Sequence, residues 1–108
     1  MVRVYAVTCL KTGRAYIGCS AGKLAKRFRE HKCLAKSGKH HAKALVEEWA
    51  KFDDKDFIVS VLELLGENPT LIQKREAELK WLKVYADKSL LLNQAIVSFS
   101  PTPDATLP

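Results

Sequence analysis

The chain has 108 residues, 47% of them hydrophobic, which is enough for one core but too short for two. Lys and Arg outnumber Asp and Glu by 18 to 12, so the surface carries a net charge of +6 and is expected to attract polyanions, nucleic acid first. No run of about 18 apolar residues is present, and the N-terminus lacks the apolar stretch of a signal peptide. We therefore expect a soluble intracellular protein without a membrane partner.

Three cysteines, Cys9, Cys19 and Cys33, form no Cys-x-x-Cys pair, and their odd number argues against a disulfide framework. We expect reduced thiols. Cys33 lies close in sequence to all three histidines, which makes a zinc or metal-storage protein one alternative. The paired spacing of structural zinc ligands is, however, missing.

The first predicted element is a β-hairpin with strands over residues 2–9 and 14–18, both rich in β-branched and aromatic residues. A two-residue loop, whether Lys11-Thr12 or Thr12-Gly13, would place Tyr5 and Tyr16 on the same face of the sheet. A three-residue loop without a bulge would separate them, because a one-residue slip turns side chains over. Simple packing of two phenols is the alternative explanation.

Residues 23–36 have the apolar spacing of a helix, with Ser20 as a candidate N-cap and Gly38 just beyond the C-terminal end. Arg27 and His31 lie one turn apart beside the apolar stripe. The pattern therefore places a guanidinium and an imidazole together at the boundary of the core.

A second helix is predicted over residues 40–49. The stretch 57–64 is short and apolar at both odd and even positions, which predicts a strand covered on both faces beside the hairpin. The order of elements indicates an α/β domain, in which a small three-stranded antiparallel sheet, the hairpin plus this later strand, is flanked by helices. We expect the domain to span residues 1–97 and residues 98–108, with three prolines, to form a flexible tail.

A third helix is predicted to begin with Asn68 as its N-cap and to end near residue 85. Glu78 falls in the middle of its apolar stripe, whereas Glu76 points roughly the opposite way. Burial of a carboxylate without a partner is costly. Two explanations stay open for Glu78. It forms an ion pair with Lys74 or Arg75, or it has a metal-binding or catalytic role.

The joint spacing of these residues resembles the GIY-YIG nuclease family over residues 2–95. The second half of the family name is literal here, as Tyr16-Ile17-Gly18, while Arg3-Val4-Tyr5 stands where Gly-Ile-Tyr is usual. The same order then continues with an Arg-x-x-x-His pair, a glutamate and an asparagine, at Arg27, His31, Glu78 and Asn93. This chain is similar to the family as a stand-alone nuclease domain with a degenerate first motif.

The resemblance implies hydrolysis of DNA phosphodiester bonds with one divalent metal ion, Mg²⁺ or Mn²⁺ as its substitute. Glu78 would bind the metal, since a hard cation often takes one carboxylate together with phosphate and water. Arg27 would stabilise charge on the phosphate. Tyr5 would accept a proton from the attacking water once its phenol is activated, Tyr16 would position water or phosphate, and His31 is a second proton-transfer candidate because imidazole titrates near neutrality.

Further residues are expected to support the site. His40 matches a histidine of some homing-type family members, while His41 beside it is interpreted as a surface residue. Asn93 is expected to tie the last segment to the sheet, with a phosphate contact as the alternative. Diffuse attraction of DNA is assigned to five basic residues, Lys11, Arg14, Lys23, Lys26 and Lys43.

Two function classes compete on this predicted fold. The first is an endonuclease acting on double-stranded or branched DNA, with low intrinsic sequence specificity or with specificity supplied by a homo-oligomer, a partner or the shape of the DNA. The second is a catalytically silent nucleic-acid-binding module on the same fold, which the loss of the first-motif glycine at Arg3 keeps open. The compact chain is compatible with a phage or mobile-element enzyme.

Overall fold

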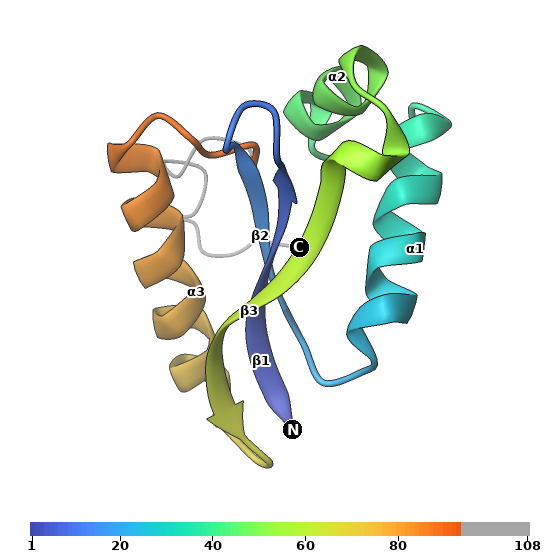
Figure 1. The fold of residues 1–108 in the computed structure, drawn as a ribbon. Coiled ribbons are helices and arrows are strands. Elements are labelled where there is room, and N and C mark those ends of the chain that lie inside the picture. Colours follow the sequence, from blue (N-terminus) through green and yellow to red (C-terminus); the bar gives the residue numbers. More distant parts are fainter. Residues whose placement is uncertain (94–108) are drawn as a thin grey trace.

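The structure, a computed structural model, describes residues 1–93. Its three strands form one antiparallel sheet in the order β2-β1-β3. Helices α1 and α2 cover one face of the sheet and α3 covers the other (Figure 1). The predicted fold class is confirmed, whereas the expected boundary at residue 97 and the tail at 98–108 lie outside the described residues. In chain order the elements are β1 (Val2–Cys9), β2 (Ala15–Ser20), α1 (Leu24–Lys36), α2 (Lys43–Lys51), a 3₁₀ turn (Asp54–Asp56), β3 (Phe57–Gly66) and α3 (Leu71–Asp87).

The hairpin register puts both tyrosines on one face. Tyr5 pairs with Gly18 and Val7 with Tyr16, and directly paired residues of an antiparallel ladder point the same way. The strands have the register that a Lys11-Thr12 loop predicts. The connection itself is longer, because pairing ends with the Cys9 N–H bonded to the Arg14 carbonyl, at 2.8 Å.

Each face of the sheet contributes to a separate core. Beneath α1 and α2 the core contains Tyr5 and Tyr16 together with Leu45 and Trp49. Beneath α3 the alternate strand residues, including Val4 and Ile17, pack on Ala77 and Leu82. The period of two in the hairpin thus assigns the tyrosines to the α1 face and the aliphatic residues to the α3 face.

The prediction that residues 57–64 are covered on both faces is wrong. β3 is an outer strand, and Ile58, Val61 and Leu64 along it are exposed by 43%, 44% and 61%. A register shift opposite Val4 and Tyr5 also interrupts the alternation of buried and exposed positions. A run of apolar residues therefore marked this strand correctly but did not reveal its position at the edge.

Two predicted helix caps are also wrong. Helix α1 starts after Lys23 without a side-chain cap, and the Ser20 hydroxyl instead accepts a bond from the Gly22 N–H within the preceding turn. Helix α3 is capped by Thr70, not by Asn68. Thr70 and Gln73 satisfy each other's backbone N–H groups in a capping box, which supplies two bonds where a single Asn68 side chain would supply one.

The link between α1 and α2 turns the chain back onto α1. Gly38 has a φ of +77°, and the N–H groups of Lys39 and His40 both donate to the Leu34 carbonyl, at 2.9 and 3.1 Å. Helix α2 consequently begins at Lys43 rather than at residue 40. His40 lies in this link, where its side chain is held beside the helix that carries His31.

Within residues 1–93, no helix combines the length and the apolar composition that crossing a bilayer requires.

Candidate active site

Tyr5 and Tyr16 are almost fully enclosed on the α1 face, with 1% and 8% of their surface exposed. The Tyr5 ring lies directly over Gly18. A Cβ atom at Gly18 would lie 2.5 Å from the Tyr5 Cζ atom and would also clash with Oη, so only glycine fits beneath this ring. Arg3, in the place of the first-motif glycine, instead bonds through its guanidinium to the Gly22 carbonyl. The close approach that requires glycine thus occurs in the second half of the motif.

A chain of buried hydrogen bonds leads inward from Tyr5. Tyr5 Oη lies 2.7 Å from His31 Nε2, and His31 Nδ1 lies 2.7 Å from His40 Nε2. This series of hydrogen bonds ends at the protein backbone, where the Ala42 N–H donates to His40 Nδ1 at 3.0 Å. Both imidazoles are buried, with 3% and 4% of their surface exposed. Helix α1 and the link to α2 thereby provide the second wall of the site.

Arg27 closes the site from the preceding turn of α1. Its Nη2 donates to Tyr5 Oη at 3.3 Å, while Nη1 binds Glu30 at 2.7 Å. The buried Nε has no hydrogen-bond partner among the described residues. The guanidinium is half-exposed, so one side is fixed by protein contacts and the other remains accessible to an anion.

Tyr16 has a histidine partner of its own. Its Oη lies 3.0 Å from Nε2 of His41, and its ring packs within 4.9 and 5.1 Å of the rings of His31 and His40. The interpretation of His41 as a surface residue is incomplete, because an exposed histidine that bonds to Tyr16 extends the site. The sequence carried a signal for it only as the adjacency of two histidines.

Glu78 projects from α3 and is half-buried. Within residues 1–93, no ion pair or hydrogen bond joins its carboxylate to another group, so the alternative of an ion pair with Lys74 or Arg75 finds no support there. Burial raises the pKa of Glu78 above its usual value. Its negative charge in turn raises the pKa of Tyr5 and of Tyr16.

Burial shifts the pKa values of the two tyrosines and of the histidines His31 and His40. It raises the pKa of Tyr5, against a hydrogen bond and a positive charge from Arg27 that lower it, and raises that of Tyr16 further. Burial, reinforced by the charge of Arg27 and the neighbouring histidines, lowers the pKa of His31 to about 3. The pKa of His40 falls to about 4, from burial first and then from His41 and Arg27. The expectation that His31 titrates near neutrality is wrong, because burial first, and then nearby positive charge, hold the pKa of His31 and of His40 well below their usual value.

The Asn93 side chain hydrogen-bonds to the outer edge of β2. Its Oδ1 accepts from the Ile17 N–H at 2.7 Å and its Nδ2 donates to the Ile17 carbonyl at 2.9 Å. The Leu90 carbonyl and Leu92 N–H bond to Ala15 in the same way, at 2.8 Å each. The side-chain amide thus imitates one more residue of an added strand and keeps the edge of the tyrosine-bearing strand paired.

The five predicted basic residues lie in different parts of the fold. Lys11, Lys23, Lys26 and Lys43 are exposed and lie at the hairpin turn and at the starts of α1 and α2. Arg14 forms an ion pair instead. Its guanidinium lies 3.6 Å from the carboxylate of Glu48, whose side chain is 2% exposed. Thr12 also donates to Glu48. This buried carboxylate under the hairpin turn was not foreseen from the sequence.

Cys33 is exposed on α1, and in the described part of the chain no three His, Cys, Asp or Glu side chains come together as a metal-binding cluster. The histidines near Cys33 in sequence are bonded to tyrosines and to each other. The zinc alternative thus has no geometric basis in residues 1–93.

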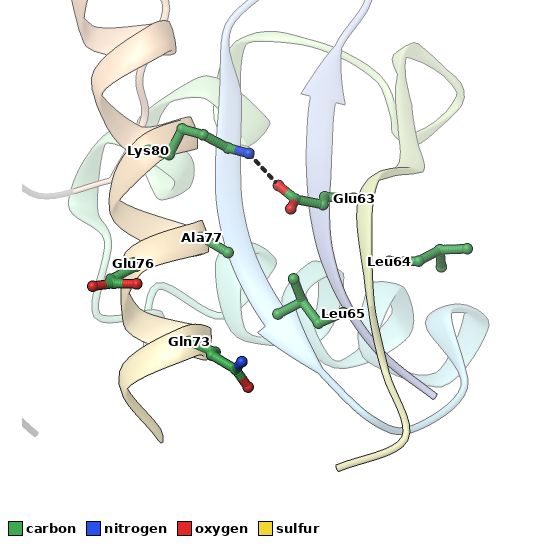
Figure 2. A pocket seen from close by; sticks show the side chains of 7 residues that line it. All are labelled: Glu63, Leu64, Leu65, Gln73, Glu76, Ala77 and Lys80. Carbon is green, nitrogen blue, oxygen red and sulfur yellow. Dashed lines mark ion pairs between the residues drawn. The ribbon is translucent and has the colours of Figure 1, made fainter. Parts of the chain in front are cut away.

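A separate groove lies between β3 and α3, on the opposite face of the sheet from the tyrosines. The Lys80 ammonium of α3 forms an ion pair across this groove with the Glu63 carboxylate of β3, at 2.7 Å. Glu76 points away from the sheet (Figure 2). The orientation of Glu76 agrees with the prediction that Glu76 and Glu78 face different ways on the helix.

Comparison with known proteins identifies the family. The family model described as the GIY-YIG catalytic domain matches residues 1–90. The chain belongs to the GIY-YIG family. The resemblance predicted from sequence is therefore confirmed, and with it a nuclease domain.

Two solved structures share the fold of this GIY-YIG domain. The catalytic domain of the homing endonuclease I-TevI matches with a TM-score of 0.71 and 22% identity, over 88% of this chain and 99% of that one. A mutant form of the catalytic domain of intron endonuclease I-TevI matches with a TM-score of 0.72 and 22% identity, over 93% of this chain and 100% of that one. No curated protein matches.

The GIY-YIG domain brings most of the predicted site residues together. Tyr5 bonds to both Arg27 and His31 on the α1 face. The Tyr16 ring packs on His31, and His40 is bonded to the same histidine. Sequence reasoning assigned no role in the site to Gly18, to His41 or to the main-chain N–H of Ala42. Only Gly18 had a signal in the sequence beyond its neighbours, as the last residue of Tyr-Ile-Gly.

Proposed function

We propose that this GIY-YIG domain is a metal-dependent endonuclease that hydrolyses DNA phosphodiester bonds by a one-metal mechanism. One observation carries the proposal, namely that Arg27 donates to Tyr5 Oη while the charge of the unpartnered Glu78 carboxylate acts on both phenols. A positive donor and a single hard oxygen ligand are what phosphodiester hydrolysis requires. The two similar solved structures, both catalytic domains of endonucleases, support the same reaction class.

The residues present fit a hard divalent cation such as Mg²⁺ or Mn²⁺. The Glu78 carboxylate is half-buried and has a raised pKa, and no cation of the described chain neutralises it. A carboxylate in this state gains from a metal ion and can hold it with phosphate oxygens and water as the other ligands. When bound, the ion would polarise the phosphate and lower the pKa of coordinated water.

The other residues act directly on the substrate and on protons. Arg27 presents the accessible side of its guanidinium to the phosphate, where negative charge accumulates in the transition state. Tyr5, held by Arg27 and His31, would accept the proton of the attacking water through Oη from its ionised, phenolate form, which returns it to the phenol. Tyr16 positions the water or the phosphate beside it.

Substrate selection is expected to be weak in the domain itself. The exposed lysines at 11, 23, 26 and 43 supply attraction to the DNA backbone, which carries no sequence information. Sequence or structure preference would then come from a second copy, a partner or the shape of double-stranded or branched DNA.

A plasmid assay tests the proposal with matched variants. Glu78→Gln should lower the cleavage rate in Mg²⁺ about 100-fold or more, because the ligand charge is lost while the shape is kept. Glu76→Gln on the same helix, whose side chain points away from the sheet, should cleave normally. On α1, Arg27→Ala should be inactive and the exposed Arg29→Ala active.

Two outcomes would contradict the nuclease proposal. Undiminished cleavage by Glu78→Gln would remove the metal role of this residue. Salt-dependent DNA binding by the unaltered protein without any strand scission, across plasmid, linear and branched DNA in Mg²⁺ and Mn²⁺, would instead establish the catalytically silent binding module.

A further inference from the structure

The hydrogen-bond chain behind Tyr5 has a fixed end. A main-chain N–H can only donate, so the bond of the Ala42 N–H to His40 Nδ1 makes this nitrogen an acceptor. Ala42 is itself fully buried. It is the N-cap residue of α2 and has an extended backbone conformation, with a φ of −88° and a ψ of 97°. The direction of this bond is therefore set by the backbone and is independent of any ring.

Each imidazole in the chain is neutral at pH 7 and carries one N–H, since burial lowers the pKa of His31 to about 3 and that of His40 to about 4. With Nδ1 an acceptor, the proton of His40 sits on Nε2 and is donated to His31 Nδ1. The proton of His31 then sits on Nε2 and is donated to Tyr5 Oη.

We propose that the main-chain N–H of Ala42 fixes the tautomers of His40 and His31, so that Tyr5 Oη accepts its hydrogen bond from His31 instead of donating one. His40 is on this basis a positioning residue that acts through His31, not a DNA contact. The reverse direction would require a proton on His40 Nδ1, opposite the Ala42 N–H at 3.0 Å, with two donors facing each other in a buried site.

The consequence for Tyr5 rests on the proposed nuclease function. Oη receives two hydrogen bonds, from His31 Nε2 at 2.7 Å and from Arg27 Nη2 at 3.3 Å. The same Nη2 also lies 3.5 Å from His31 Nε2, and with a proton on Nε2 it donates to Oη and not to the ring. Both donors stabilise the phenolate relative to the phenol, and the hydroxyl proton of Tyr5 is left to point away from them, out of the relay. In the reverse direction this proton would be held by His31, and Oη would lose a donor that favours ionisation.

The tautomers can be read without metal or DNA. Long-range ¹H–¹⁵N spectra of the unaltered protein at pH 7 should show Nε2 protonated and Nδ1 unprotonated in both His31 and His40. A proton on Nδ1 of either ring would overturn the proposal, whatever the protein does to DNA, because the measurement does not depend on cleavage.

Two proline variants test the backbone donor. Ala42→Pro deletes the N–H at a residue whose φ lies near the proline range, and it should leave His31 and His40 as mixtures of tautomers. Lys43→Pro places proline at the first position of α2, where it is favoured, and should keep both Nε2–H tautomers. Pure Nε2–H tautomers in Ala42→Pro would refute the role of the amide.

His40→Phe links the relay to catalysis. Its kcat should fall about 10- to 100-fold, the size of the effect of losing an orienting partner, while its affinity for DNA stays unchanged. An unaltered kcat would contradict the role of His40, and a loss of DNA affinity with kcat preserved would return it to the DNA contacts. Cys33→Ser, an exposed change on α1, serves as the active control.

Discussion

The contact between Tyr5 and Gly18 predicts that Gly18→Ala damages stability and activity together. The added Cβ would lie 2.5 Å from the Tyr5 Cζ atom and 3.0 Å from Cε2, so the ring must move off its position. Overpacking of a buried contact costs about 1–3 kcal/mol, and movement of the ring also breaks the 2.7 Å bond to His31. Gly22→Ala is the matched control, since its nearest neighbour would be Ser20 Oγ at 3.8 Å.

Urea denaturation of the two variants measures the difference, and plasmid cleavage measures its effect on the site. In a Tyr5→Leu background, where the ring is absent, Gly18→Ala should cost no more than Gly22→Ala does. A coupling free energy of about 1–3 kcal/mol between positions 5 and 18 is thus expected from the double-mutant cycle. Equal stability of Gly18→Ala and Gly22→Ala in the unaltered background would refute the reasoning.

Three further predictions concern stability. Asn93→Ala removes both bonds to Ile17 and should lower the free energy of unfolding by about 1–3 kcal/mol, measured by urea denaturation. His31 and His40 have folded pKa values below the unfolded value near 6.5, so the unfolded chain binds their protons first and stability falls as pH falls from about 6.5 to 4. The slope should be about 1 kcal/mol per pH unit for each histidine, and His40→Phe should reduce it; an unchanged slope would contradict the assignment. Glu78→Gln should stabilise the metal-free protein at pH 7 and lose this advantage near pH 4, because the raised pKa of Glu78 means that its ionised form disfavours folding; a loss of stability at pH 7 in chelator would argue against it.

Local patterns in the sequence were sufficient where the determining interactions are themselves local. The hairpin followed from β-branched residues and a tight turn, and the parity of its loop alone put Tyr5 and Tyr16 on one face. Helical spacing selected Glu78 over Glu76 as the inward carboxylate. Gly38 was recognised as the end of α1 because a left-handed residue is needed there whatever the tertiary structure.

The errors occurred where distant parts of the chain decide. The exposure of Val61 depends on strand order, which places β3 at the edge, and no periodicity encodes that order. The pKa of His31 depends on burial against β1 and on charge from Arg27. The role of the Ala42 amide is invisible to any reading of side-chain types, because the donor belongs to the main chain.

The different surroundings of the two phenols support the proposed role of Tyr5 as the base. Tyr5 and Tyr16 are both buried, and both are close to the charge of Glu78. Only Tyr5 accepts a bond from Arg27, and this bond and the positive charge lower its pKa against the effect of burial. Tyr16 bonds to His41, and burial raises its pKa further, because Arg27 opposes this rise through its charge alone and not through a hydrogen bond. Two like groups whose surroundings separate their pKa values take different tasks, and we infer that Tyr5 ionises and accepts the proton while Tyr16 stays a neutral phenol that donates a hydrogen bond.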